Sequence, residues 1–176
     1  PSFRWRAFTT ELLDLAAANG VTTVITLGAL LADVAHSRPI PVVCTSEDEA
    51  VAFKHDLEPA RYEGPTGITG VVADGAHQAE MVSISAWASV PHYTSQVPCP
   101  KASLALLSQL EDLLDTVIDH GDLEEEAQAW ERGVDELANT DEDVAEYVSA
   151  LESAQDTSEL PEASGDAIAK EFERYL

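Results

Sequence analysis

The sequence predicts an α/β protein with mainly parallel strands, followed by an α-helical appendage. Over residues 1–120, apolar segments with helical spacing alternate with short β-branched segments, a pattern typical of a sheet with helices packed on it. Beyond Gly121 only helical spacing recurs. At 176 residues the chain is long enough to bury a core. We therefore expect an α/β domain over residues 1–120 and a helical appendage over residues 121–176.

The expected elements of the α/β part follow in order. Residues 3–18 repeat apolar side chains at helical spacing and stop at Asn19-Gly20, a frequent helix C-terminus. Residues 21–27 are rich in β-branched side chains and predict a buried strand that ends at Gly28. The remaining elements are a strand over 41–46, a short helix to about 54, a helix over 68–80, a strand over 81–90 and a leucine-rich helix over 101–115.

The appendage is predicted to contain three helices. Apolar side chains recur at 4-3-4-3 spacing over residues 123–137, which indicates one helix with a single apolar face. A second helix begins near Thr140, and a polar hinge over 156–161 precedes a last helix that ends the chain. We expect an αα-hairpin plus a terminal helix.

The charge of the chain limits its partners. The net charge is −24, and residues 111–176 carry 22 of the 33 acidic residues with 3 of the 9 lysines and arginines. Such a surface repels nucleic-acid phosphates and anionic membranes, so neither is an expected partner. The acidic segment is either a solvated helical face or a surface for a basic partner protein. Two isolated cysteines and the lack of a long apolar run favour a cytoplasmic protein.

Three polar clusters follow the predicted strands, where α/β sheets place ligands. The first follows the strand 21–27, the second is the glycine-rich loop 62–70, and the third follows the strand 81–90. If these clusters converge, they could serve acid–base or anion-binding chemistry. Asp33 and Ser37 belong to the first cluster, and the candidate binding residues are Gly28, His36, Arg38, Glu63, Gly64, Thr66, Gly67, His92, Tyr93 and Lys101.

Several of these candidates have a structural alternative. Arg38 could pair with Asp33, and Glu63 could cap the following helix. His92 is the strongest single candidate because it stands at a strand end. Lys101 lies at a predicted helix N-terminus, which is unfavourable for a cation without an anion nearby. The five histidines are widely spaced and no nucleotide-binding motif is present, so we expect no metal and no cofactor.

Several runs, taken in order, resemble the bacterial branch of the PAC2 family, which is named for proteasome assembly chaperone 2. They are residues 3–8, 26–34, 36–39, 62–68, 90–93, 100–102 and 163–176. The resemblance implies a phosphorylase/hydrolase-like three-layer α/β core, a homotrimer, and C-terminal helices that form a lid over a ligand cleft. It also implies that residues 1–120 are the C-terminal portion of that core, with the N-terminal portion preceding Pro1.

Two hypotheses about function follow. The first is a ligand-binding or assembly-chaperone-like protein, with a small molecule or a protein as partner, whose cleft at the strand ends is covered by the acidic lid. The alternative is a phosphorylase- or hydrolase-type enzyme that uses His92 or Glu63 as acid or base. Whether the protein is an enzyme stays open, and hydrogen-bond contact between His92 and Glu63 would favour the enzyme.

Overall fold

The computed structural model of the chain describes residues 1–59, 64, 66–94 and 98–158, which fall into two compact units. The sheet unit consists of Pro1–Leu30, Pro41–Ala88 and Ala105–Asp119. The hairpin unit consists of Leu31–Ile40, Ser89–Leu104 and the described residues from His120 onward. None of the helices in the described ranges has the length and apolar character that a membrane crossing requires.

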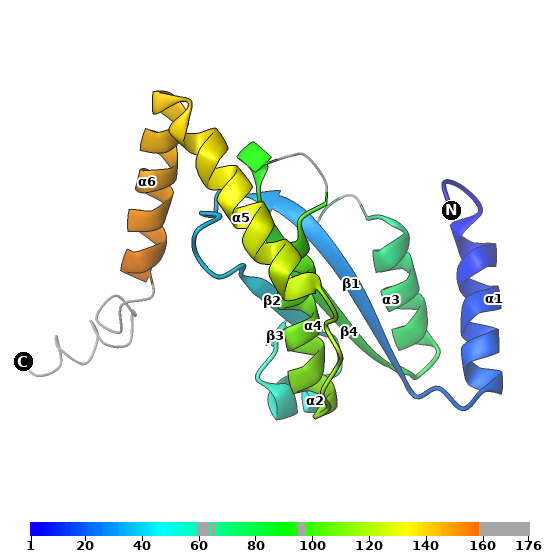
Figure 1. The fold of residues 1–176 in the computed structure, drawn as a ribbon. Helices are drawn as coiled ribbons and strands as arrows, with labels where there is room; N and C mark the ends of the chain where they lie inside the picture. Colours follow the sequence, from blue (N-terminus) through cyan, green and yellow to red (C-terminus); the bar gives the residue numbers. More distant parts are fainter. Residues whose placement is uncertain (60–63, 65, 95–97, 159–176) are drawn as a thin grey trace, which may run out of the picture. The chain divides into compact units, whose positions relative to one another are not determined.

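A four-stranded mixed sheet, in the order β1-β4-β2-β3, forms the centre of the sheet unit (Figure 1). The strands are β1 (Thr23–Ala32), β2 (Val42–Ser46), β3 (Glu58–Pro59) and β4 (Val82–Pro91), the ends of β1 and β4 belonging to the hairpin unit. The β2 strand pairs with β3 in parallel and with β4 antiparallel. The strands predicted at 41–46 and 81–90 are confirmed, whereas the two-residue β3 was not expected.

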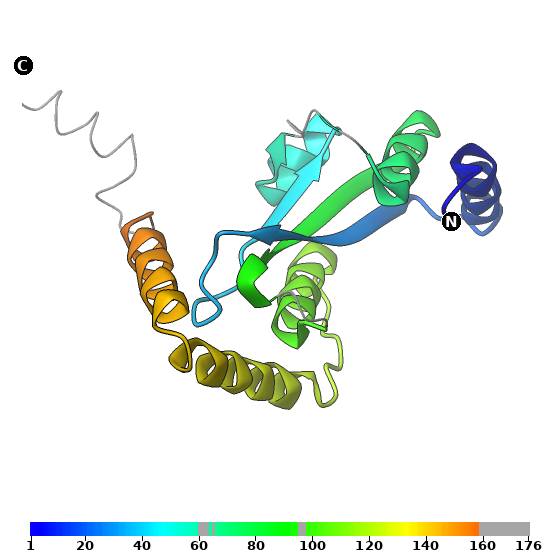
Figure 2. The same ribbon diagram turned by 90° about the horizontal axis from the view of Figure 1, so that it is seen from above.

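The β1 and β4 strands run in the same direction. The Val82 N–H donates to the Thr22 carbonyl oxygen at 2.9 Å, and the Thr26 and Ser85 hydroxyl oxygens are 2.9 Å apart. Residue numbers therefore rise together along both strands, as Figure 2 shows. The expectation of mainly parallel strands holds for β1–β4 and β2–β3, and fails for the antiparallel β2–β4 pair.

The prediction that the first strand ends at Gly28 is wrong, because β1 continues to Ala32. Gly28 therefore lies inside the strand and does not follow it. A Cβ atom at this position would lie 2.5 Å from Cζ3 of Trp87, so the indole occupies the space of a side chain. The sequence signal for a strand end was a glycine, but here glycine permits close packing within the sheet.

Four helices contribute to the sheet unit, and all four were expected. They are α1 (Trp5–Ala18), α2 (Glu49–His55), α3 (Ile68–Gln78) and the C-terminal part of α4 (Pro100–Leu114). Asp48 caps α2, since its carboxylate accepts hydrogen bonds from the N–H groups of Ala50 and Val51. α1 lies beside α3, where a Cβ atom at Gly75 would be 2.7 Å from Cγ2 of Thr9.

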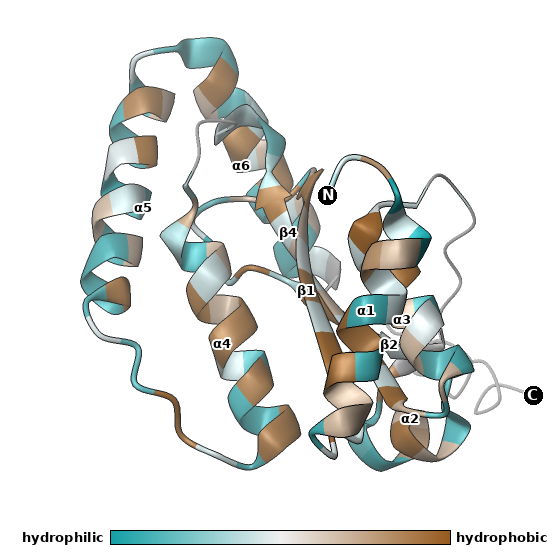
Figure 3. Ribbon diagram, turned by 90° about the vertical axis from the view of Figure 1, so that its right-hand side faces the viewer, coloured by the Kyte–Doolittle hydropathy of each residue, from teal (hydrophilic) through white to brown (hydrophobic). Residues whose placement is uncertain are grey.

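The hairpin unit is built on α5 (Leu123–Asn139) and α6 (Glu142–Ser158), with the short 3-10 turn η1 (His92–Thr94). The predicted αα-hairpin is confirmed. Apolar and polar bands alternate along α5 (Figure 3), and the buried side chains of the two helices are small or medium in size: Ala127, Val134, Ala138 and Val148. The terminal helix expected near the chain end lies outside the described residues.

Candidate functional site

His36 is the buried centre of a polar cluster in the hairpin unit, with only 1% of its surface exposed. Its backbone N–H and its ring Nδ1 both lie 2.8 Å from the hydroxyl oxygen of Tyr93, and its Nε2 lies 3.0 Å from Oδ1 of Asp135. The ionised Asp135 carboxylate can only accept, so Nε2 carries a proton and donates it to Asp135. In the neutral ring Nδ1 then accepts from the Tyr93 O–H.

Burial raises the pKa of the Tyr93 hydroxyl, although the His36 backbone hydrogen bond opposes the shift. The phenol therefore stays protonated at neutral pH and keeps its role as a donor. Asp135, His36 and Tyr93 form a continuous hydrogen-bonded chain from α5 to η1.

Lys101 stands in the first turn of α4 and is neutralised by a carboxylate. Its Nζ donates to the carbonyl oxygen of His36 at 2.6 Å and forms an ion pair with Glu131 of α5. A cation at a helix N-terminus is unfavourable without an anion nearby, and the Glu131 carboxylate supplies that anion for Lys101.

Arg38 binds carboxylates of α6. Its Nε donates to Oδ1 of Asp156 at 2.7 Å and its Nη2 to Oδ2 at 2.8 Å, a two-pronged geometry, and its Nη1 lies 3.6 Å from Glu152. The Ser37 hydroxyl also donates to Glu152. The hydrogen bonds from the guanidinium hold the pKa of Asp156 below its ordinary value.

His92 lies in an aromatic cluster with a carboxylate at its rim. Its Nδ1 is 3.3 Å from Oδ1 of Asp33, and the Tyr147 hydroxyl donates to the same oxygen at 3.1 Å. The rings of His92, Tyr93 and Tyr147 pack edge to face with centroids 5.5–6.0 Å apart. The His92 side chain is 46% exposed, so it remains open to solvent.

The hairpin unit thus brings five predicted residues together: His36, Arg38, His92, Tyr93 and Lys101. Three of them meet carboxylates that the sequence reasoning missed, which we call the carboxylate latch: Glu131, Asp135, Glu152 and Asp156. The acids of the latch are four residues apart on α5 and again on α6, which places each pair on one helix face. Other acids share this spacing, Glu142 and Glu146 among them, so the sequence alone does not single out the latch.

The other predicted residues belong to the sheet unit or lie outside the described residues. Gly28 is within β1, and Gly67 precedes the first turn of α3. The Thr66 hydroxyl donates to the Gly67 carbonyl oxygen at 3.3 Å, and Gly64 is exposed. Glu63 lies outside the described residues, so its contact with His92 and its capping role stay predictions.

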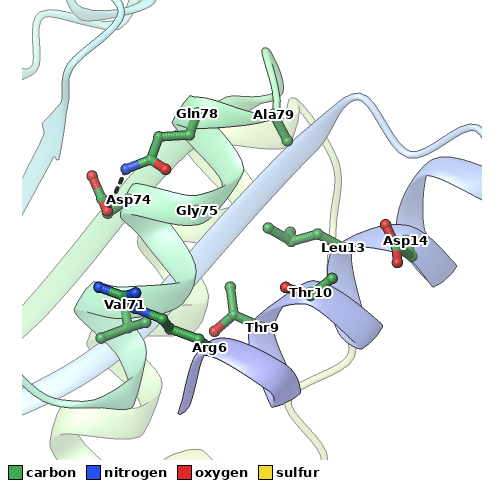
Figure 4. A pocket seen from close by; sticks show the side chains of 10 residues that line it. All are labelled: Arg6, Thr9, Thr10, Leu13, Asp14, Val71, Asp74, Gly75, Gln78 and Ala79. Carbon is green, nitrogen blue, oxygen red and sulfur yellow. Dashed lines mark hydrogen bonds between the residues drawn. The ribbon is translucent and has the colours of Figure 1, made fainter. Parts of the chain in front are cut away.

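A groove between α1 and α3 of the sheet unit was not predicted from the sequence (Figure 4). Its volume is about 570 Å³. Within it the amide of Gln78 donates to Asp74 at 2.8 Å. The lining is mixed in polarity: Arg6, Thr9, Thr10, Leu13, Asp14, Val71, Asp74, Gly75, Gln78 and Ala79.

The two cysteines are unpaired thiols. Burial raises the pKa of both Cys44 and Cys99, although the N–H groups that open α4 and the Lys101 charge pull that of Cys99 downward. Both thiols are therefore protonated at neutral pH, which favours packed side chains over a reactive nucleophile. Among the described residues, no group of three histidine, cysteine or acidic side chains is arranged to hold a metal ion.

The fold and the polar cluster define a mixed α/β protein with an acidic helical hairpin held by basic and aromatic side chains. Residues 1–138 match the model of the PAC2 family. The chain therefore belongs to the PAC2 family, and the resemblance seen in the sequence is confirmed. No curated protein matches it.

Solved structures agree with this assignment. A PAC2 family protein from Streptomyces avermitilis is 52% identical with a TM-score of 0.78, over 84% of this chain and 62% of that one. A Mycobacterium tuberculosis protein described as a proteasome-assembly chaperone homologue is 46% identical with a TM-score of 0.74, over 84% of this chain and 63% of that one. A second M. tuberculosis protein, of unknown function, is 28% identical with a TM-score of 0.81, over 89% and 53%. The chain thus spans less than two thirds of the length of these relatives.

Proposed function

We propose that this chain is part of an assembly-chaperone-like protein that acts by binding a partner protein. The observation that carries the proposal is the 46% identity to a protein described as a proteasome-assembly chaperone homologue. The partner would then be a proteasome subunit or a protein of similar assembly. The fold alone does not decide function, since one architecture hosts many activities.

The geometry of the hairpin unit supports binding over catalysis. Both ring nitrogens of His36 are engaged, and Lys101 and Arg38 are paired with carboxylates of the same chain. A general acid or base must exchange its proton with a substrate, which these side chains cannot do while they hold the hairpin. Their contacts stabilise the positions of α5 and α6 within the hairpin unit.

One observation favours the enzyme alternative. His92 is half exposed and lies 3.3 Å from the Asp33 carboxylate, and a histidine beside a carboxylate is an arrangement used for general bases. A thermal-shift screen of nucleosides, inorganic phosphate and short peptides on the longer natural protein, repeated with His92→Ala, tests this alternative. If a ligand raises the melting temperature of the His92→Ala variant as much as that of the unchanged protein, His92 is not part of the ligand site.

The lid and cleft are part of the proposal. We expect the acidic helices of residues 121–176 to cover a cleft at the strand ends, with the predicted binding residues at its wall, on a phosphorylase/hydrolase-like three-layer core. A homotrimer is expected from the family, and its mass in solution would be three times that of one copy of the whole protein. A cytoplasmic location, expected from the two unpaired thiols, remains a prediction.

An exposed apolar region in the sheet unit supports the expectation of an N-terminal portion of the core. Among the described strands β1 is at one edge of the sheet, and its Leu27 and Leu30 are 39% and 47% exposed. Phe8 and Leu15 of α1 are 41% and 64% exposed. An apolar pocket of about 230 Å³ lies there, lined by Pro1, Phe8, Thr26, Leu27, Ile68, Thr69 and Val72. Additional strands beside β1 would cover such a surface.

Co-assembly tests the main proposal. The longer natural protein is mixed with the proteasome α- and β-subunits of its own organism, and complexes are followed by native electrophoresis and light scattering. We expect a complex with unassembled subunits and faster formation of the full particle. If the protein neither co-migrates with any subunit nor changes the assembly rate, the assembly-chaperone function is wrong.

A further inference from the structure

Basic side chains are scarce in this chain, and three nitrogen-bearing side chains of the hairpin unit contact the acids of α5 and α6. The sequence has 9 lysines and arginines against 33 acidic residues. Lys101 binds the carbonyl oxygen of His36 at 2.6 Å, and Arg38 follows His36 two residues along the loop. We call His36, Arg38 and Lys101 the basic triad.

The carboxylates that contact the basic triad are regularly spaced along their helices. Glu131 and Asp135 are four residues apart on α5, as are Glu152 and Asp156 on α6. Four residues make about one helical turn, so each pair projects from one face. The α5 pair contacts Lys101 and His36, and the α6 pair contacts Arg38. Each part of the basic triad therefore fits a helix that carries two carboxylates one turn apart.

Carboxylates of a partner protein can replace those of the carboxylate latch, because the contacts that hold the hairpin are only partly buried. The side chains of Asp135 and Asp156 are 55% and 53% exposed, and those of Glu131 and Glu152 are 35% and 30% exposed. The exposed fractions of the bases are 2% for His36, 17% for Lys101 and 32% for Arg38. Ion pairs whose carboxylates stand in water are individually weak and are screened by salt. A competing carboxylate can reach the bases from the solvent side once a latch carboxylate moves away.

We propose that the basic triad is a docking surface for an acidic helix of a partner protein, and that the chain's own α5–α6 hairpin covers this surface until such a helix displaces the carboxylate latch. The inference rests on the proposed function, since it names the chemistry of the partner that an assembly-chaperone-like protein would bind. The hairpin then acts as an internal competitor, and only a partner with correctly spaced acids opens it.

A peptide probe tests the docking surface. The probe is a fluorescent synthetic peptide with the sequence of residues 123–139, and its matched control carries Glu131→Gln and Asp135→Asn. The target is the full chain, either unchanged or with Glu131→Gln and Asp135→Asn, which remove the α5 carboxylates that the probe would replace. We expect the weakened chain to bind the probe about tenfold more tightly than the unchanged chain, as the loss of a few ion pairs implies. The control peptide should bind neither form well.

Hydrogen exchange supplies the second readout. The probe should raise exchange in residues 123–139 of the chain, because a displaced helix loses protection. An Arg38→Met, Lys101→Met double variant should no longer bind the fluorescent probe, whereas Lys101→Arg, which keeps the charge, should still bind it. If the double variant does not fold, the comparison is made with Lys101→Gln alone.

The outcomes separate the alternatives. Equal binding of probe and control peptide, or unchanged binding by the charge-removing variants, overturns the docking surface. Stronger binding of a lysine-rich peptide would overturn it in favour of a basic partner on the acidic helices. A chain that joins proteasome subunits but ignores the probe refutes the docking surface alone, and the reverse result refutes the proteasome partner alone.

Discussion

Replacing Tyr93 with phenylalanine removes one oxygen on which two groups of His36 depend. That oxygen accepts the His36 backbone N–H and lies 2.8 Å from ring Nδ1, while His36 is 1% exposed. The substitution would leave two buried polar groups without this partner. Each such group costs about 1–3 kcal/mol, so we expect the free energy of unfolding to fall by roughly 2–4 kcal/mol after partial relaxation.

Urea unfolding followed by circular dichroism measures this loss. The matched control is Tyr147→Phe, whose hydroxyl binds Asp33 at an exposed position, so its effect should stay below about 1 kcal/mol. Nitrogen NMR of the His36 ring should also show the proton on Nε2 in the unchanged protein and a mixture of tautomers in Tyr93→Phe. A loss no greater than that of Tyr147→Phe would refute the central position assigned to the Tyr93 oxygen.

Two further predictions concern packing and pH. A methyl group at Gly28 would lie 2.5 Å from the Trp87 ring, so Gly28→Ala should destabilise the protein by about 1–3 kcal/mol. A methyl group at Gly133 would have no neighbouring atom within 4 Å, so Gly133→Ala should be neutral or stabilising. Thermal unfolding of the two variants tests this difference. Arg38 holds the pKa of Asp156 below its ordinary 3.8, so the stability that this pair contributes is complete above 3.8 and is lost as pH falls through the lower folded value. Amide exchange in α6, corrected for intrinsic rates, should rise in that acidic range, and Arg38→Met should show increased exchange already at neutral pH and little further change.

Local patterns predicted the helices and most of the strands because those elements follow from spacing. The 3.6-residue repeat over residues 3–18 and the paired stripes of 123–137 and 144–151 each match one described helix. The end of β1 was mispredicted because Gly28 carries the same local signal whether it ends a strand or admits the Trp87 ring. That distinction depends on a residue 59 positions away, which no local pattern contains.

The candidate site was predicted in part for a similar reason. Placing function at strand ends singled out His36, Arg38 and His92, which lie in one unit of the structure. The carboxylate partners of His36 and Arg38 come from helices about 100 residues later, whereas that of His92 is Asp33. A strongly acidic sequence offers many carboxylates, and spacing alone does not choose among them. The strand-end rule pointed to the loop that carries the bases, and only the fold shows which acids they contact.

Hydrogen exchange of the α5–α6 hairpin in an Arg38→Met, Lys101→Met double variant tests the central claim most directly. The claim is that basic side chains of the loop and of α4 hold the acidic hairpin in place. We expect faster exchange throughout residues 123–158 of the variant, with the protection of β4 residues 82–88 in the sheet unit unchanged. Protection of the hairpin equal to that in the unchanged chain would show that packing alone holds α5 and α6, and would contradict the account.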